Sequence, residues 1–437
     1  MSRTPRKTLG QYFTLAPELQ DFVFSVVKHK SAELLEPSFG AGHLLQRFKD
    51  YDSNYPMACY ELDATIPPVV RFNDFQQCTY GDFTVQDIRK KFRTIVGNPP
   101  YVKQTAGNLY IVFIELCYNH LADDGEMVFI VPSDFLKATR AAPIITTMAA
   151  HGSFTDFLFP HNEQLFPGAN IDVMVFRYEK GLYTDTAAVS AHTKTTRMFC
   201  NIVRGIITFS AAKLAGVLAA DVFDVYVGLV SGRDEIYKVP FGNMAVLTDD
   251  GQTEAFIFAD TFPSGNAAID AHLAAHKASL LARRIRKFGE HNWHEWGAPR
   301  NIANIRRHWG RPCIYVRNIT RSTTVAFVGS VQYFGGSLLC LVPKHDATAD
   351  AGTAVADLQK ITEYLNSAEF QTNYRYAGRF KIGHKQISST LMPIAATIAT
   401  ATTTATAATT TIATATATAT ASTKPNPNPN PSTNPST

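Results

Sequence analysis

The sequence predicts an α/β fold with a mostly parallel sheet, and three observations lead to this prediction. From Ser31 to about Tyr178, short apolar runs alternate with helical stretches, which is typical of successive βα units. A glycine-containing turn at residues 37–42 follows the first apolar run. A later run at residues 94–97 leads directly into Asn98-Pro99-Pro100-Tyr101 without an intervening helix. Folds of this class place their sites at the carboxyl ends of strands.

The expected elements follow in order along the chain. We expect strands at residues 32–36, 57–63, 94–97, 126–131 and 171–178, and helices at residues 43–50 and 109–121. A strand-like stretch at residues 198–209 precedes a second body of mixed α+β character. The predicted domains are residues 1–211, residues 212–393 and a tail, residues 394–437. Because the tail alternates Ala with Thr and then Pro with Asn, it cannot bury enough apolar surface, and we expect disorder.

Composition limits the class of protein. The chain has 437 residues, 45% hydrophobic and 18% charged, which suits two globular domains and a tail. The six cysteines are scattered without a Cys-x-x-Cys pair, so we expect neither disulfides nor a metal site. The basic N-terminus lacks the apolar run of a signal peptide, and no stretch approaches the roughly 18 apolar residues of a membrane span. We therefore expect an intracellular, cytoplasmic protein.

Positive charge is concentrated in one window, residues 277–321. This window holds eleven Lys and Arg against two Glu, a net charge of +9 compared with +4 for the whole chain. All three tryptophans, Trp293, Trp296 and Trp309, lie in the same window. Interleaved basic and aromatic side chains suit a nucleic acid. The alternative is a solvated basic face with two or three core aromatics.

Two features of the first half resemble an adenosine-binding site. Gly40 and Gly42 lie in the turn after the first strand, where glycine lets the backbone approach a ligand. Glu61 lies about twenty residues later, near the end of the second strand, where a carboxylate accepts both ribose hydroxyls. Glycine-rich turns after strands are common, so this layout alone also fits a purely structural role.

Asn98-Pro99-Pro100-Tyr101 is the more specific motif. Two prolines stiffen the chain and remove two donors, so that the carbonyl of Pro99 and the side-chain oxygen of Asn98 form two fixed acceptors. These suit the two hydrogens of a planar amino group, and Tyr101 offers a ring on which its base can stack. When both hydrogens are accepted, the nitrogen lone pair becomes more available as a nucleophile. A sulfonium methyl donor then needs only to be aligned with this nitrogen, and no general base is required. The alternative is a Pro-Pro turn that only ends a strand.

Together these motifs resemble the DNA adenine-N6 methyltransferases, in the subgroup whose catalytic motifs precede a C-terminal target-recognition domain. The resemblance covers roughly residues 8–392 and implies a Rossmann-like catalytic domain that uses S-adenosylmethionine. It implies a modification enzyme of a type II restriction-modification system in a prokaryote or virus. Asn98, Pro99, Pro100 and Tyr101 match the catalytic motif. The implied cofactor-binding residues, besides Asn98, are Gln11, Tyr12, Phe13, Thr14, Glu36, Pro37, Ser38, Gly40, Gly42, Glu61, Asp82 and Phe83.

The resemblance also implies a second aromatic that sandwiches an extruded base. Phe166, just before the strand at 171–178, stands at that position, although an isolated Phe before a strand is usually a core residue. In the second body, residues 227–235, 317–321 and 378–384 resemble stretches of the recognition domain. Basic side chains there suit phosphate contacts and base-edge readout. The expected DNA-binding residues are Arg283, Arg284, Arg306, Arg307, Arg317, Arg321, Arg379 and Lys381.

The implied partner is double-stranded DNA, from which the target adenine is rotated out to reach the site. We expect a monomer that acts on the same sequence as a cognate restriction endonuclease. Two alternatives stay open. One is an amino-methyltransferase for RNA or a protein glutamine, although glutamine enzymes place a helical domain before the catalytic one. The other is a catalytically idle DNA-binding relative, against which the intact Asn98, Glu61 and Asp82 argue.

Overall fold

A computed structural model describes residues 10–74, 76–104, 107–167, 170–191, 194–344, 351–376 and 378–393. The predicted tail at 394–437 lies outside these residues. The helices are α2 (Pro17–Val26), η1 (His43–Leu45), α3 (Gln46–Tyr51), η2 (Phe83–Val85), α4 (Leu109–His120), η3 (Ser133–Lys137), α5 (Ala142–His151), α6 (Ala219–Val222), α7 (Asp234–Tyr237), α8 (Ala267–Ala275), α9 (Lys277–Leu281), α10 (Ile302–Arg307), α11 (Ala351–Asn366), α12 (Ala368–Thr372) and α13 (His384–Ser388), where η marks a 3-10 helix.

The strands of the N-terminal part are β1 (Leu34–Glu36), β2 (Met57–Glu61), β3 (Gln76–Tyr80), β4 (Phe92–Gly97), β5 (Lys103–Gln104), β6 (Gly107–Asn108), β7 (Leu121–Pro132), β8 (Gly152–Phe159), β9 (Val173–Lys180), β10 (Thr186–Ala191), β11 (Lys194–Val203) and β12 (Ile206–Ser210). Those of the C-terminal part are β13 (Val217–Leu218), β14 (Phe223–Val227), β15 (Met244–Leu247), β16 (Thr253–Phe256), β17 (Pro312–Arg317), β18 (Ile319–Thr320), β19 (Ala326–Ser330), β20 (Leu338–Pro343), β21 (Arg375–Tyr376), β22 (Arg379–Lys381) and β23 (Leu391–Met392).

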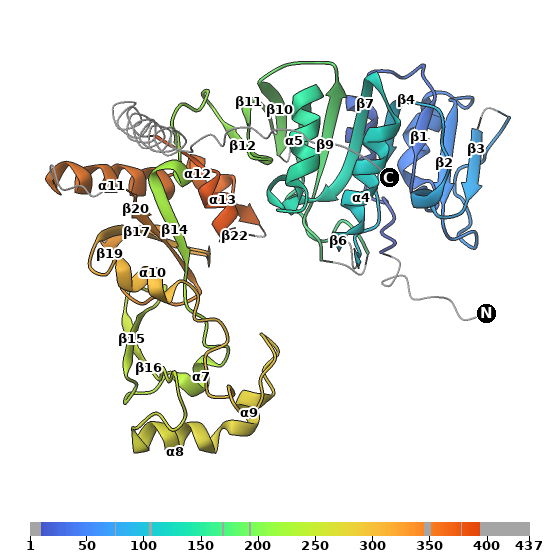
Figure 1. Cartoon of the computed structure of the whole chain (residues 1–437). Helices are drawn as coiled ribbons and strands as arrows, with labels where there is room; N and C mark the ends of the chain where they lie inside the picture. The colour runs from blue at the N-terminus through green and yellow to red at the C-terminus, as the bar shows by residue number, and fades with distance from the viewer. Residues whose placement is uncertain are drawn as a thin grey trace, which may run out of the picture.

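One ten-stranded sheet organises the N-terminal part, residues 10–210, in the order β12-β11-β10-β8-β9-β7-β4-β1-β2-β3 (Figure 1). Neighbours from β7 to β3 pair in parallel, whereas β9 is antiparallel to both β7 and β8. The α/β class predicted from the sequence is therefore confirmed, with antiparallel strands added at one side. The expected strand at 198–209 is a hairpin of β11 and β12, because Arg204 and Gly205 both have positive φ, as a two-residue hairpin turn requires.

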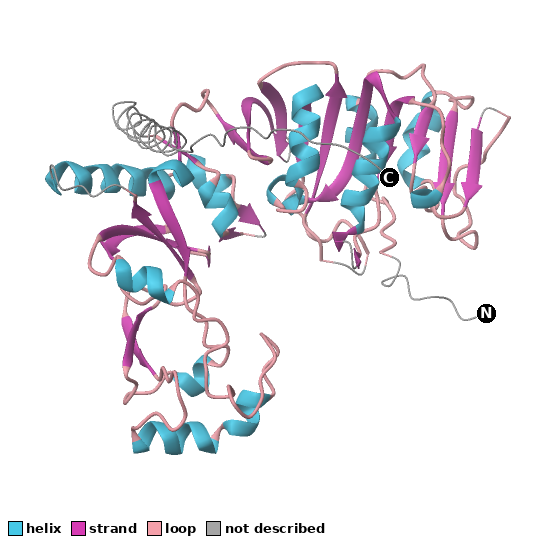
Figure 2. Ribbon diagram, viewed as in Figure 1, coloured by secondary structure: helices cyan, strands magenta, loops and turns pink. Residues whose placement is uncertain are grey.

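Alternating side chains give the sheet two packed faces. Ile95 of β4 and Met127 of β7 face the core beneath α4 and α5, whereas their neighbours Val96 and Val128 face the core beneath α2. Because successive strand residues point to opposite sides, a strand covered on both faces is apolar throughout, as these two are. Figure 2 shows helices packed against this sheet.

A buried ion pair anchors the N-terminal helix to the sheet. Arg177 of β9 and Glu126 of β7 are both fully buried, and the Arg177 Nε lies 2.8 Å from the Glu126 carboxylate. That carboxylate also accepts hydrogen bonds from the main-chain N–H groups of Lys28 and His29, just after α2. Since both charges are paired and hydrogen-bonded, their burial is tolerated, and α2 is fixed relative to β7.

The C-terminal part, residues 217–393, begins and ends on one strand pair, β13 with β23. Its main sheet has the order β14-β20-β17-β19, and α11 packs against β17 and β19. The predicted domain boundary at residue 211 falls in the link between β12 and β13. Within the described residues, every helix is too short or too polar to span a lipid bilayer.

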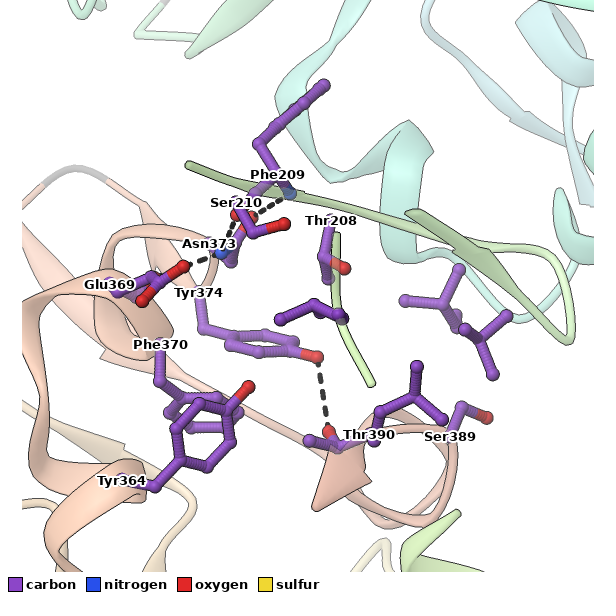
Figure 3. A pocket seen from close by; sticks show the side chains of 14 residues that line it. Thr208, Phe209, Ser210, Tyr364, Glu369, Phe370, Asn373, Tyr374, Ser389 and Thr390 are labelled. Atoms are coloured by element: carbon purple, nitrogen blue, oxygen red, sulfur yellow. Dashed lines mark hydrogen bonds between the residues drawn. The ribbon is translucent and has the colours of Figure 1, made fainter. Parts of the chain in front are cut away.

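Asn373 joins the two parts. Its side-chain oxygen accepts from the main-chain N–H of Phe209 at 2.7 Å, and its amide nitrogen donates to the Phe209 carbonyl at 2.9 Å (Figure 3). A second link runs from the Gln386 amide to the carbonyl of Lys137 at 3.2 Å. In Figure 1, α12 and α13 accordingly lie beside β12, while the rest of the C-terminal part extends away from the sheet.

Candidate active site

A cavity of about 340 Å³ opens at the carboxyl ends of β1, β2 and β4. Its walls come from six short segments between residues 10 and 113. Most of the cofactor residues expected from the sequence line it, namely Gln11, Tyr12, Phe13, Pro37, Ser38, Gly40, Glu61, Asp82, Phe83 and Asn98, together with Pro100. The remaining lining residues, which the sequence did not single out as binding residues, are Gly10, Leu62, Gly81, Thr84, Val102, Leu109, Val112 and Phe113.

Glu61 and the turn after β1 are locked together. One carboxylate oxygen of Glu61 accepts from the main-chain N–H of Gly40 at 2.6 Å, and the other accepts from that of Asp63 at 2.8 Å. Gly40 has a φ of +58°, and a Cβ there would lie 3.2 Å from the Phe13 ring. Burial raises the pKa of Glu61. The carboxylate keeps lone pairs beyond these two bonds, so it can still accept from a ligand hydroxyl.

Three expected cofactor residues, Glu36, Gly42 and Thr14, lie behind the cavity wall. Gly42 has a φ of +86°, and a Cβ there would come within 2.5 Å of Phe39 and Val70. Its glycine is therefore required by packing. Thr14 accepts through Oγ1 from the Asn98 amide at 3.0 Å.

Glu36 supports the loop from below. It is 1% exposed, and its Oε1 accepts from both the N–H and the hydroxyl of Ser38, at 3.0 and 3.1 Å. Burial raises the pKa of Glu36 to about 8, an effect that outweighs the two hydrogen bonds. The Glu36 side chain thus fixes the loop that places Ser38 at the cavity, but Glu36 does not line the cavity itself.

Asp82 and Phe83 close the far end of the cavity. Asp82 caps η2, accepting through Oδ1 from the N–H and hydroxyl of Thr84 at 2.8 and 2.7 Å. Phe83 is buried and stacks on Phe113 of α4, with ring centroids 5.4 Å apart. The apolar face of α4 thus contributes a wall. The periodicity of residues 109–121 predicted the helix, but it could not show that one side of it faces a cavity.

Asn98 occupies the junction between this cavity and the aromatic residues. Its amide nitrogen donates to the carbonyl of Tyr12 at 2.7 Å and to the hydroxyl of Thr14, while its side-chain oxygen accepts from the Tyr101 hydroxyl. The carbonyl of Ile130 on β7 lies 3.0 Å from the Tyr101 hydroxyl and is a second acceptor for its one hydrogen. Both amide hydrogens of Asn98 are thus engaged by main-chain and side-chain oxygens of residues 12 and 14, and its oxygen accepts from Tyr101. Pro99 is buried, and Pro100 lines the cavity.

Three aromatic rings meet beside Asn98. The rings of Tyr101 and Phe166 lie 6.2 Å apart and nearly perpendicular, at 78°. The Tyr12 ring lies 5.5 Å from Tyr101 and 5.8 Å from Phe166. Phe166 is 1% exposed and packs with Val173 and Val175 in the core cluster beneath α2. The structure therefore brings Phe166 next to Tyr101, with Tyr12 as their common neighbour.

The expected DNA-binding side chains differ in accessibility. Arg283 is 6% exposed, and its guanidinium donates to the carbonyls of Leu280, Ser231 and Trp293. Arg317 donates to the carbonyls of Asp249 and Thr324, and Arg306 donates to the Tyr333 hydroxyl at 2.9 Å. Their donors are directed at the protein itself, most completely for Arg283. Exposed side chains are found at Arg284, Arg306, Arg307, Arg321, Arg379 and Lys381.

Two of the three tryptophans in the basic window are core residues, as the alternative of a basic face with core aromatics predicted. Trp293 and Trp296 are 3% and 2% exposed and belong to a core cluster of the C-terminal part. Trp309 alone of the three is exposed, at 54%, and packs on Tyr333 with ring centroids 4.9 Å apart. Sequence position could not separate them, because a tryptophan in a basic window can point to either side.

Sheet, loops and cavity together define the α/β fold of a methyltransferase domain joined to a mixed C-terminal part. The chain aligns over 88% of its length with the DNA complex of the type IIL restriction-modification enzyme MmeI, at a TM-score of 0.54, 7% identity and 64% coverage of that chain. Residues 68–166 match the family model described as Eco57I restriction-modification methylase. This segment is therefore similar to a restriction-modification methylase domain, in agreement with the resemblance to restriction-modification methyltransferases predicted from the sequence.

Relatives with curated names cover the same region. The chain is 24% identical over 210 residues to the type II methyltransferase M.HincII of Haemophilus influenzae, covering 42% of this chain and 40% of that protein. It is 26% identical over 196 residues to the type II methyltransferase M.CvrRI of Paramecium bursaria Chlorella virus XZ-6E, covering 41% of this chain and 51% of that protein. The matched regions thus span about 40% to 51% of these relatives.

Proposed function

We propose that this chain transfers a methyl group from S-adenosylmethionine to the N6 amino group of adenine within a specific double-stranded DNA sequence. One observation carries the proposal. The side-chain oxygen of Asn98 lies between a cavity with two carboxylates, Glu61 and Asp82, and a pair of aromatic rings, Tyr101 and Phe166. A methyl donor on one side and a planar base on the other would meet at this residue.

The cavity fits the proposed cofactor in size and chemistry. Its volume of about 340 Å³ falls in the range of small-molecule sites, roughly 300–1,000 Å³. Glu61 would accept from the ribose hydroxyls, Asp82 from the adenine amino group, and Phe83 would pack on the adenine ring. The loop at Pro37 and Ser38 and the segment at residues 10–14 would enclose the methionine end. When bound, S-adenosylmethionine supplies an electrophilic methyl group.

The chain's own residues would act by positioning. Asn98 holds its oxygen toward the incoming amino group because its nitrogen is bound by Tyr12 and Thr14. The amino group would replace the Tyr101 hydroxyl as the partner of that oxygen, while the Tyr101 ring stacks on the base. Accepting an amino hydrogen makes the nitrogen a better nucleophile, and alignment supplies the rest of the acceleration. After the transfer the amino nitrogen would lose one proton to solvent, so such a site needs no general base.

DNA is proposed as the substrate because of the C-terminal part. Its exposed side chains Arg284, Arg307, Arg321 and Arg379 provide positive charge outside the methylase domain. Arginine and lysine contacts to phosphates supply most non-specific DNA affinity. A paired adenine is inaccessible, so the base would be rotated out of the duplex to reach Tyr101 and Phe166. A protein amide would need no such extended basic surface, and the test below separates DNA from RNA.

The test is expression in cells that lack adenine methylation, followed by DNA sequencing that detects N6-methyladenine. We expect one short sequence to be modified at its adenine, and the Asn98→Ala chain to leave it unmodified. The purified chain should also transfer label from S-adenosylmethionine to DNA and leave RNA and protein unlabelled. Cofactor binding without any DNA modification would overturn the proposal and favour a catalytically idle DNA-binding relative. Labelled RNA or protein would favour an amino-methyltransferase that acts on RNA or on a protein glutamine.

A further inference from the structure

A second cavity, of about 550 Å³, lies where the N-terminal and C-terminal parts meet. η3 and the ends of β8 and β10 form one side, and α12 and β21 form the other. Its wall is largely apolar, with Leu136, Phe159 and Phe209 among the lining residues. It is separate from the cavity at Asn98, although η3 directly follows β7, the sheet neighbour of β4. The proposed methyl transfer leaves this cavity without a role.

Lys137 is the unusual residue in this wall. It is 5% exposed, and its ammonium lies 5.3 Å from the centroid of the Tyr374 ring and 5.9 Å from that of Tyr376. Over the part of the chain that the structure describes, no salt bridge of this ammonium is found, and no neighbouring charge contributes to its pKa. Burial lowers its pKa to about 7. A buried cation without a counter-ion is costly, and ring faces offset only part of that cost.

Tyr376 supplies a second unsatisfied group. Its hydroxyl is buried and has no hydrogen-bond partner among the described residues. Buried hydroxyls are nearly always hydrogen-bonded, so an unsatisfied one beside a cavity indicates a missing acceptor. Lys137 belongs to the N-terminal part and Tyr376 to the C-terminal part. An anion between them would satisfy both groups at once and would connect the two parts.

Charge around the cavity favours a polymer phosphate. Arg375 and Lys194 line the opening, and exposed Lys381 lies on β22, which pairs with β21. Two acids, Asp172 and Glu369, also line it. Burial raises the pKa of Asp172, and Glu369 is exposed at the rim. The cavity follows the same carboxyl edge of the sheet as Asn98, on the side of the C-terminal part, where a duplex held by both parts would pass.

We propose that this cavity binds a backbone phosphate of the DNA strand close to the target nucleotide, with Lys137 as its cation and Tyr376 as a hydrogen-bond donor. The inference rests on the proposed function. Since each part contributes one group, the bound phosphate would set the angle at which the C-terminal part holds the duplex. Lys137 is a positioning residue in this scheme and takes no part in the transfer itself.

The test uses the full chain and duplexes that contain the modified sequence, each with one phosphate replaced by an uncharged methylphosphonate. Wild-type chain should lose affinity about 10-fold to 100-fold when one particular phosphate near the target is neutralised. Lys137→Met should bind the unmodified duplex more weakly by a similar factor and be insensitive to that replacement. Tyr376→Phe, which removes only one oxygen atom and should fold normally, should show a smaller loss at the same phosphate.

Lys90→Met is the matched control, because exposed Lys90 pairs with Glu33 at the far side of the sheet and loses the same charge. Lys90→Met should lose as much affinity as the wild type when that phosphate is neutralised. The inference is overturned if Lys137→Met and Tyr376→Phe keep that sensitivity, even though the wild type methylates DNA. A different result would also overturn it. If inorganic phosphate binds the wild type but not Lys137→Met, and the wild type binds all the methylphosphonate duplexes with the same affinity, the cavity binds free phosphate and not DNA. Absence of methylation by the wild type would refute the proposed function separately.

Discussion

The rings of Tyr12 and Tyr101 are stacked, with centroids 5.5 Å apart and an interplanar angle of 26°. Tyr12 also contacts Phe166, so its ring fills the space beside both residues that are proposed to hold a base. Its carbonyl accepts from the Asn98 amide. The main chain of Tyr12 thus orients Asn98, while its side chain covers the face on which a base would stack.

We predict that Tyr12→Ala shifts the base-flipping equilibrium toward the extruded base. A base can stack on Tyr101 only after the Tyr12 ring moves, so removing the ring removes that cost. Fluorescence of 2-aminopurine at the target position should rise severalfold at saturating protein, and Tyr12→Phe should behave as the wild type. Lower fluorescence in Tyr12→Ala would show that the ring holds the extruded base instead of excluding it.

Asn98→Ala should lower kcat by about 10²-fold to 10³-fold, the usual cost of deleting one polar group that stabilises a transition state. Cofactor affinity, measured by calorimetry, should change only a few-fold, because Glu61 and Asp82 remain. Tyr101→Phe keeps the ring and removes the hydroxyl that donates to Asn98, so its loss in kcat should be below tenfold. Equal losses in both variants would mean that the hydroxyl, and not the Asn98 oxygen, is the essential group.

Glu36 should make stability depend on pH. Its pKa is raised from 4.5 to about 8 in the folded chain, so the folded state holds the proton more tightly than the unfolded state. The resulting stabilisation is complete below about pH 4.5 and is lost as the pH rises toward about 8. The Tm of Glu36→Gln, which cannot ionise, should therefore improve relative to the wild type between pH 5 and pH 9. Glu18→Gln, at an exposed position, should show no such trend.

Substitution of Arg283 should lower stability, whereas substitution of its neighbour Arg284 should change only DNA binding. Arg283→Ala removes a buried side chain that donates to three carbonyls, of which only that of Ser231 keeps another donor among the described residues, the N–H of Gly297, and this should cost about 2 to 5 kcal/mol of unfolding free energy. Arg284→Ala should leave stability unchanged and reduce the salt dependence of DNA binding by about one unit of slope. Chemical denaturation and binding at several salt concentrations measure the two effects. If Arg283→Ala folds stably and its DNA binding depends less on salt than that of the wild type, Arg283 contacts DNA after all.

Motifs fixed in local sequence were predictable. Asn98-Pro99-Pro100-Tyr101, Glu61 and the turn at Gly40 each lie at or just after the end of a strand, and parallel strands bring their ends together, so the grouping around one cavity follows from the α/β class. What could not be predicted depends on distant packing. The burial of Arg283 requires carbonyls from residues 231 and 293, and the position of Tyr12 requires two rings more than 80 residues away. Composition placed Arg283 in a basic window without showing its orientation.

The clamp between Asn373 and Phe209 uses only main-chain atoms on the side of the sheet. A side chain at position 209 can therefore change without disturbing the two hydrogen bonds, as long as β12 keeps its path. Exchange of the C-terminal part for another would keep this clamp wherever an asparagine is retained at position 373, but the contacts of Lys137 with Tyr374 and Tyr376 would have to be matched as well.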